Sequence, residues 1–168
     1  MTAQGPTASA EAAYDALARE GATVALAESL TGGAVTAALT AVPGASRVVV
    51  GGVVAYETRL KAELLGVDED LLRRRGAVDP DVARQMAAGV RRVLGATYGV
   101  ATTGAAGPDP APGGTEVADV PAGTAYIAVS GPAGTQVHHV RLGGDRAEVR
   151  AAVVDEALAA LASAVRGS

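Results

Sequence analysis

The chain has almost no aromatic side chains with which to fill a hydrophobic core. Its 168 residues include four Tyr and no Phe or Trp, although hydrophobic residues make up 49% of the sequence. The core must therefore consist mainly of Ala, Val and Leu, and such small side chains let helices pack close to a sheet. The same scarcity disfavours proteins that bind single-stranded nucleic acid by stacking bases on aromatic rings.

Composition excludes several other classes of protein. With 49% hydrophobic and 19% charged residues, the chain is too apolar to be disordered. It has no cysteine, which excludes disulfide scaffolds, thiolate nucleophiles and Cys-type zinc sites. A net charge of −4 gives no electrostatic support for binding nucleic acid. The first twenty residues carry charges where a signal peptide is apolar, and no apolar run reaches the roughly 18 residues of a membrane helix. We therefore expect a soluble, cytoplasmic protein with no nucleic-acid or membrane partner.

Short apolar runs alternate with segments of helical pattern, as in α/β proteins. Strands are expected at residues 23–27, 47–56 and 98–102, with a hairpin formed by 124–130 and 135–142. Helices are expected at residues 9–20, 34–41, 57–65, 68–75, 80–94 and 146–165. These elements predict a three-layer α/β/α sandwich with a mixed sheet. We expect one domain over residues 1–168, with residues 1–7 as a flexible tail.

Ser29 lies where the first buried strand meets a helix. Ligands of open α/β sheets bind at the carboxyl ends of the strands, and the free N–H groups at a helix start favour negative charge. A hydroxyl at this place is suited to holding a phosphate, or to acyl transfer with an oxyanion bound by those N–H groups. Gly32 and Gly33 would let a substrate approach the backbone. The alternative is that Ser29 and Thr31 simply cap the helix.

Lys61 is the only lysine in a chain that otherwise uses arginine, with 13 Arg among its 14 basic residues. Arg keeps its proton in proteins, whereas a buried Lys can lose it and act as a base that activates a serine. The alternative is chance, since an arginine-rich chain still contains an occasional lysine. Tyr56 precedes Lys61 by five residues, and not by the four typical of short-chain dehydrogenases.

The segment 102–107 is a second strand end followed by small residues. Thr103 and Gly104 are placed to supply hydroxyl and N–H donors at the same edge as Ser29, although a surface turn explains them equally well. His138 and His139 are neighbours on a strand, so they point to opposite faces and cannot both bind one metal ion. The sequence around Ser29 lacks the G-x-S-x-G elbow of α/β-hydrolases, and no Lys follows the glycines as a P-loop requires.

Several of these residues belong to blocks that occur together in a known family. The blocks are Ala27-Glu28-Ser29-Leu30-Thr31-Gly32-Gly33, Tyr56 with Lys61, Gly76-Ala77-Val78, Thr103-Gly104-Ala105-Ala106-Gly107-Pro108 and Gly144-Asp145-Arg146. In this order they closely resemble the CinA C-terminal domain family, whose enzymatic members (PncC type) are nicotinamide-nucleotide amidases. The likeness runs from about residue 9 to residue 165.

The resemblance implies hydrolysis of the carboxamide of nicotinamide mononucleotide, giving nicotinate mononucleotide and ammonia, in pyridine nucleotide salvage. It implies Ser29 as nucleophile and Lys61 as general base, with Tyr56 assisting. It also implies that the substrate site is lined by Thr31, Gly32, Gly33, Thr103 and Gly104, with Arg146 on the nucleotide phosphate. No metal or organic cofactor is implied, and we expect a homo-oligomer, most simply a dimer.

Two departures from the family pattern bear on specificity. Leu30 stands where many relatives carry Cys, and residues 109–122 form a long Pro-rich stretch that we expect to alter substrate access. Two other functions stay open: a nucleotide-binding module of the same fold without turnover, and a structural subunit of a larger assembly. Retention of both Ser29 and Lys61 favours the enzyme, because a binding module needs no lysine that can lose its proton.

Overall fold

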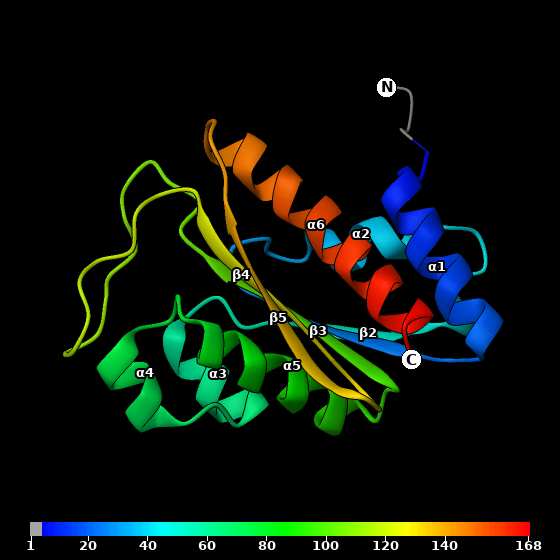
Figure 1. Cartoon of the computed structure of the whole chain (residues 1–168), viewed down its shortest axis with the longest axis horizontal. Helices are drawn as coiled ribbons and strands as arrows, with labels where there is room; N and C mark the ends of the chain where they lie inside the picture. The colour runs from blue at the N-terminus through cyan, green and yellow to red at the C-terminus, as the bar shows by residue number, and fades with distance from the viewer. Residues whose placement is uncertain (1–4) are drawn as a thin grey trace.

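A mixed five-stranded sheet forms the middle of the computed structural model, which describes residues 5–168 (Figure 1). The strands are β1 (Val24–Glu28), β2 (Val49–Val54), β3 (Tyr98–Gly104), β4 (Thr124–Gly131) and β5 (Gly134–Arg141). Their order across the sheet is β2-β1-β3-β4-β5. β1 is parallel to both of its neighbours, whereas β4 is antiparallel to β3 and to β5. The carboxyl ends of β1, β2 and β3 therefore meet at one edge of the sheet.

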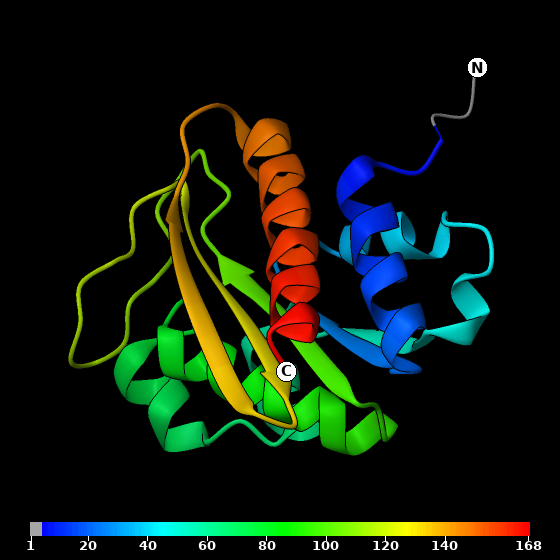
Figure 2. The ribbon, with the colours of Figure 1, turned by 45° about the vertical axis from the view of Figure 1, so that its right-hand side comes forward.

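Helices cover both faces of this sheet (Figures 1 and 2). One face is covered by α1 (Ala8–Glu20), α2 (Ala34–Thr40) and α6 (Arg146–Arg166). The other is covered by α3 (Thr58–Leu65), α4 (Glu69–Arg75) and α5 (Pro80–Leu94). The three-layer α/β/α sandwich predicted from the sequence is thereby confirmed. Within residues 5–168, no helix is both long and apolar enough to cross a membrane.

Small side chains make up most of the core, as the composition requires. Ala10, Ala13 and Leu17 of α1 are completely buried in the layer that also contains α6. On the opposite face, a Cβ atom placed on Gly99 of β3 would lie 2.1 Å from the carbonyl oxygen of Ala87 in α5. Helix α5 therefore packs directly on the backbone of β3, which only glycine at this position permits.

Some element boundaries differ from those expected. Thr7, and not Ser9, caps α1, because its hydroxyl accepts a hydrogen bond from the N–H of Ala10, whereas Ser9 Oγ donates to Asp155. Thr7 is thus part of an ordered helix start, and residues 1–4 of the expected tail lie outside the described residues. The expected strand 47–56 begins only at Val49, because residues 45–47 form a short 3₁₀ turn.

Candidate active site

Ser29 begins a tight turn directly after β1. Its N–H donates to the carbonyl oxygen of Thr102 at 3.0 Å, which continues the β1–β3 pairing by one residue. The N–H of Gly32 donates back to the carbonyl oxygen of Ser29 at 3.1 Å, closing the turn. Gly32 and Gly33 have φ angles of 61° and 100°, in the left-handed region that favours glycine. The two glycines are therefore needed for the shape of the turn that presents Ser29.

Lys61 reaches Ser29 from α3, across 32 residues of sequence. Its Nζ donates to Ser29 Oγ at 3.0 Å, to the carbonyl oxygen of Ala55 at 2.8 Å and to that of Tyr56 at 3.3 Å. Lys61 is only 1% exposed, and Ser29 is 9% exposed. The structure thus brings together the two residues that the sequence singled out separately.

Burial lowers the pKa of Lys61 from its ordinary value of 10.5 to about 8. The cause is desolvation of the ammonium, since taking a charge out of water favours the neutral amine. Its three hydrogen-bond partners are a hydroxyl and two carbonyl groups, none of which carries a compensating negative charge. A useful fraction of Lys61 is therefore neutral near physiological pH.

This lowered pKa predicts how stability changes in alkaline solution. Between about pH 8 and pH 10.5 the unfolded chain holds the Lys61 proton and the folded chain does not, so the free energy of unfolding rises with pH. Relative to Lys61→Met, the wild-type protein should gain about 3 kcal/mol between pH 7 and pH 11. Urea unfolding of both proteins across this range measures the difference, and parallel curves would contradict the lowered pKa.

Glu28, the last residue of β1, was not singled out by the sequence analysis. It is 1% exposed, and its carboxylate accepts hydrogen bonds from the N–H groups of Gly33, Val35 and Thr36 at 2.7–3.0 Å. These are the free donors at the start of α2 that we expected to bind an anion or an oxyanion. That expectation was wrong, because Glu28 already occupies them. Ser29 does not cap the helix either, since Gly33 is the N-cap residue of α2 and the N–H groups of Val35 and Thr36 donate to Glu28.

Thr31, Gly32 and Gly33 were expected to line the substrate site. Thr31 is completely buried, and its hydroxyl donates to Glu28 Oε2 at 2.6 Å and lies 2.7 Å from Thr102 Oγ1. None of the three residues lines the pocket beside Ser29. The structure therefore assigns them to the support of the turn, because Thr31 Oγ1 and the N–H group of Gly33 donate to Glu28 and the N–H group of Gly32 donates to Ser29.

A pocket of about 240 Å³ opens beside the hydroxyl of Ser29. It is lined by Ser29, Leu30, Tyr56, Lys61, Ala77, Val78, Thr103, Gly104, Ala106, Ala111, Pro112 and Arg146. Five of the expected site residues besides Ser29 are thus gathered here, from the ends of β2 and β3, from α3 and from α6. Thr103 Oγ1 donates to the carbonyl oxygen of Ala77 at 2.7 Å, which leaves its lone pairs available to a ligand.

Arg146 connects this pocket to a larger cavity of about 620 Å³, and it lines both. Its guanidinium donates to the carbonyl oxygen of Gly107 and to the hydroxyl of Tyr56, each at 2.9 Å. The first N–H groups of α6 do not assist Arg146 in binding an anion. Asp145 accepts hydrogen bonds from the N–H groups of Ala147 and Glu148, so these two donors are already occupied.

The Pro-rich stretch 109–122 forms part of the pocket wall. Ala111 and Val120 pair in an isolated antiparallel bridge, and Ala111 lines the pocket together with Pro112. Farther along the loop, the carboxylate of Glu116 forms an ion pair with Arg74 at 3.4 Å, and the backbone N–H of Glu116 donates to the carbonyl oxygen of Arg74 at 3.0 Å. The loop is therefore fastened to the end of α4 at the same time as it borders the site.

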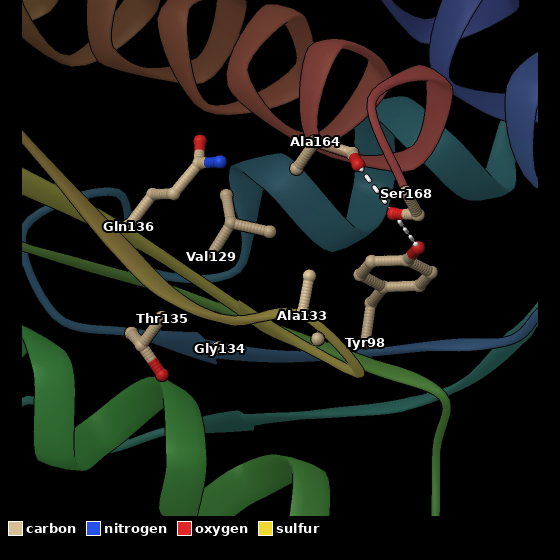
Figure 3. A pocket seen from close by; sticks show the side chains of 9 residues that line it. Tyr98, Val129, Ala133, Gly134, Thr135, Gln136, Ala164 and Ser168 are labelled. Atoms are coloured by element: carbon tan, nitrogen blue, oxygen red, sulfur yellow. Dashed lines mark hydrogen bonds between the residues drawn. The ribbon is translucent and has the colours of Figure 1, made fainter.

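A smaller hollow of about 90 Å³ lies near the other end of the sheet (Figure 3). Tyr98, at the start of β3, lies with its hydroxyl 2.6 Å from Ser168 Oγ, which in turn donates to the carbonyl oxygen of Ala164. Its lining contains no base next to a nucleophile. Within residues 5–168, no three side chains of His, Asp or Glu gather to hold a metal ion, and His139 instead stacks on Tyr126.

Solved structures of similar proteins have the same fold over nearly the whole chain. A competence/damage-inducible protein from Agrobacterium tumefaciens is 35% identical with a TM-score of 0.86, covering 98% of this chain and 99% of that one. A CinA superfamily protein from Klebsiella pneumoniae is 30% identical with a TM-score of 0.87, covering 96% of this chain and 100% of that one.

Curated relatives are similar in sequence but longer. A CinA-like protein from Frankia casuarinae is 52% identical over 142 residues, which are 84% of this chain and 31% of the relative. A CinA-like protein from Anaeromyxobacter sp. is 49% identical over 150 residues, which are 89% of this chain and 36% of the relative. The chain thus spans about a third of the length of these relatives. Residues 6–165 match the CinA C-terminal domain, and the chain belongs to this family.

Proposed function

We propose that this protein hydrolyses the carboxamide of nicotinamide mononucleotide to nicotinate mononucleotide and ammonia. The observation that carries the proposal is the 3.0 Å contact between Ser29 Oγ and the buried Nζ of Lys61, at the wall of a pocket at the carboxyl ends of the parallel strands. A serine whose hydroxyl meets a lysine of lowered pKa is one of the known arrangements for nucleophilic attack on an amide.

The hydrogen bonds of Lys61 suit a base directed at Ser29. A neutral amine has two N–H groups and one lone pair. The carbonyl oxygens of Ala55 and Tyr56 can only accept hydrogen bonds, so they take the two N–H groups. The lone pair is then left for the third partner, the hydroxyl of Ser29. Loss of the ammonium proton therefore turns Lys61 from a donor to Ser29 Oγ into the acceptor of its proton.

The proposed reaction uses this one lysine for every proton transfer. Ser29 Oγ bonds to the carboxamide carbon as its proton passes to Lys61 Nζ. The C–N bond of the carboxamide then breaks while Lys61 returns that proton to the carboxamide nitrogen. The nitrogen departs as ammonia and leaves an acyl-enzyme. A water molecule attacks the acyl carbon and gives a proton to Lys61, and Lys61 passes it to Ser29 Oγ as the acid is released.

Charge at the site supports a pyridinium substrate. The pyridinium ring of the nucleotide is positive, and it raises no repulsion with Lys61 in the neutral form that burial favours. A positive ring beside the lysine lowers the pKa of Lys61 further once substrate is bound. The ring also withdraws electrons from the carboxamide carbon, which makes that carbon easier to attack.

The activity is tested by mixing the protein with nicotinamide mononucleotide and measuring both products. Ammonia and nicotinate mononucleotide should appear in equal amounts, at a rate proportional to protein concentration. A nucleotide-binding module without turnover is the other candidate, since it would keep the same pocket. Tight binding of the nucleotide, with no ammonia above the background of a Ser29→Ala sample, would favour that alternative.

Arg146 is expected to bind the 5′-phosphate of the nucleotide. Its guanidinium lines both cavities, and within residues 5–168 it donates only to uncharged oxygens of Gly107 and Tyr56. A phosphate binds a guanidinium more strongly than a neutral oxygen does. Arg146→Ala should lower kcat/KM for nicotinamide mononucleotide about 100-fold and leave that for the dephosphorylated riboside within about threefold. Equal losses for both substrates would remove Arg146 from the phosphate site.

A further inference from the structure

The turn that carries Ser29 is held between two groups of opposite charge. Within residues 5–168, neither forms a hydrogen bond with Ser29 Oγ or Lys61 Nζ, and neither is used by the proton transfers proposed above. Glu28 precedes the turn at the end of β1, and Arg150 approaches it from α6. Each binds backbone groups of the turn or of the helix that follows it.

Glu28 holds the N–H groups on the helix side of the turn. Its Oε2 accepts from the N–H groups of Gly33 and Val35, both at 3.0 Å, and from Thr31 Oγ1 at 2.6 Å. Its Oε1 accepts from the N–H and the hydroxyl of Thr36, both at 2.7 Å. Within the described part of the chain, all five hydrogen bonds of this buried carboxylate thus go to residues 31–36.

Arg150 holds the carbonyl groups of the turn itself. Its Nε donates to the carbonyl oxygen of Leu30 and its Nη2 to that of Thr31, each at 2.9 Å. The guanidinium is half-buried, and within residues 5–168 it forms no ion pair with a carboxylate. Its charge is therefore directed at these two carbonyl dipoles.

Together these contacts fix the orientation of successive peptide planes. A peptide unit is planar, so holding its oxygen also fixes the direction of its N–H. Arg150 fixes the planes that follow Leu30 and Thr31, and Glu28 fixes the N–H of Gly33. Glycines at positions 32 and 33 supply no stiffness of their own, because they adopt many backbone conformations. Without the two charged groups, the turn would keep the hydrogen bond from Gly32 to Ser29 that closes it, but its peptide planes would be held less firmly.

We propose that Arg150 and Glu28 are positioning residues that hold Ser29 Oγ at hydrogen-bond distance from Lys61 Nζ. This inference rests on the proposed role of Ser29 as nucleophile, but it does not depend on which amide is the substrate. Displacement of a reacting group by about 1 Å costs about 100-fold in rate. Loss of either residue should therefore slow the attack by Ser29 more than it weakens binding.

The test uses Arg150→Met, Arg150→Lys and Glu28→Gln, with Arg166→Met and Glu156→Gln as controls. Both control residues are exposed on α6. Two measurements are compared. One is the steady-state kinetics of nicotinamide mononucleotide hydrolysis, which gives kcat and KM, and the other is the rate at which a small fluorophosphonate labels Ser29, which needs no nucleotide. Arg150→Met should lower kcat and the labelling rate about 10- to 100-fold, with KM within threefold of wild type and the controls unchanged.

Partial rescue separates positioning from general loss of structure. In Arg150→Lys an ammonium binds one carbonyl well but does not span two, so its rates should lie between those of wild type and Arg150→Met. Added guanidinium ion should raise the labelling rate of Arg150→Met and not that of Arg166→Met. If folded Arg150→Met is labelled at the wild-type rate, or if its KM rises while its kcat stays at the wild-type value, the inference is wrong. If Glu28→Gln does not fold, the comparison of Arg150→Met with Arg150→Lys decides whether the inference holds.

The labelling experiment distinguishes failure of this inference from failure of the proposed substrate. If the wild-type protein is labelled at Ser29 but does not hydrolyse nicotinamide mononucleotide, the proposed substrate is wrong. The ratio of the Arg150→Met and wild-type labelling rates still decides the positioning role in that case. A wild-type protein that shows neither labelling nor hydrolysis overturns both.

Discussion

Ser29→Ala is expected to reduce hydrolysis of nicotinamide mononucleotide by about 10⁴-fold or more, with little change in stability. Loss of a nucleophile removes the covalent route altogether, which typically costs several powers of ten in rate. The effect on folding should be below about 1 kcal/mol, because Ser29 does not cap α2 and, within residues 5–168, its hydroxyl forms a hydrogen bond with Lys61 alone. Removing the hydroxyl also leaves Lys61 with both of its carbonyl partners.

Kinetics and thermal unfolding on the same preparation separate these two effects. Ser163→Ala provides a matched control, because Ser163 is exposed near the C-terminal end of α6, whereas the site residue Arg146 lies at the N-terminal end of that helix. The control should keep wild-type activity. Activity of Ser29→Ala within tenfold of wild type would contradict its assignment as nucleophile, whatever the protein's stability.

Lys61→Arg should be nearly as inactive as Ser29→Ala, with a loss of about 10³-fold or more. Arginine keeps the positive charge and can still donate to the carbonyl oxygens of Ala55 and Tyr56. It does not release its proton at working pH, so it cannot accept one from Ser29. Combining both substitutions should cost little beyond either alone, because a nucleophile and its base act as one unit.

Binding shows whether the Lys61→Arg protein is intact. Circular dichroism should show a folded chain, and calorimetry should show nucleotide affinity within about tenfold of wild type. Lys61→Met, which places no bulky charge in this buried position, should be equally inactive and gives the same comparison if the guanidinium disturbs folding. Substantial turnover by Lys61→Arg would mean that Lys61 only balances charge and that another group activates Ser29.

The sequence was informative about the fold and about the central contact of the site. Alternating apolar runs and helical segments predicted the three layers, because each strand is bounded by glycine, proline or capping residues. Parallel strands align their carboxyl ends, so Ser29 after β1 and the segment after β3 were expected at one edge. The single lysine stood out chemically, although its 3.0 Å contact with Ser29 required the fold.

The supports of the turn could not be predicted in the same way. Arg150 reaches Leu30 across 120 residues, and no local pattern distinguishes it from the other arginines. Glu28 did leave a signal, since a carboxylate at the end of a completely buried strand needs several partners. The prediction that Thr31 lines the substrate site was wrong for a related reason: its hydroxyl forms hydrogen bonds with Glu28 and Thr102 and does not face the pocket.

The pH dependence of Ser29 labelling by a fluorophosphonate tests the central claim most directly, because it measures nucleophile and base without any assumption about substrate. If neutral Lys61 activates Ser29, labelling should occur at Ser29 alone and its rate should rise with pH, reaching half its maximum near the lysine pKa of about 8. In Lys61→Arg, the labelling of Ser29 should be very slow at every pH and its rate should no longer depend on pH. A wild-type rate that is flat between pH 6 and 10, or labelling at another residue, would contradict the Ser29–Lys61 assignment.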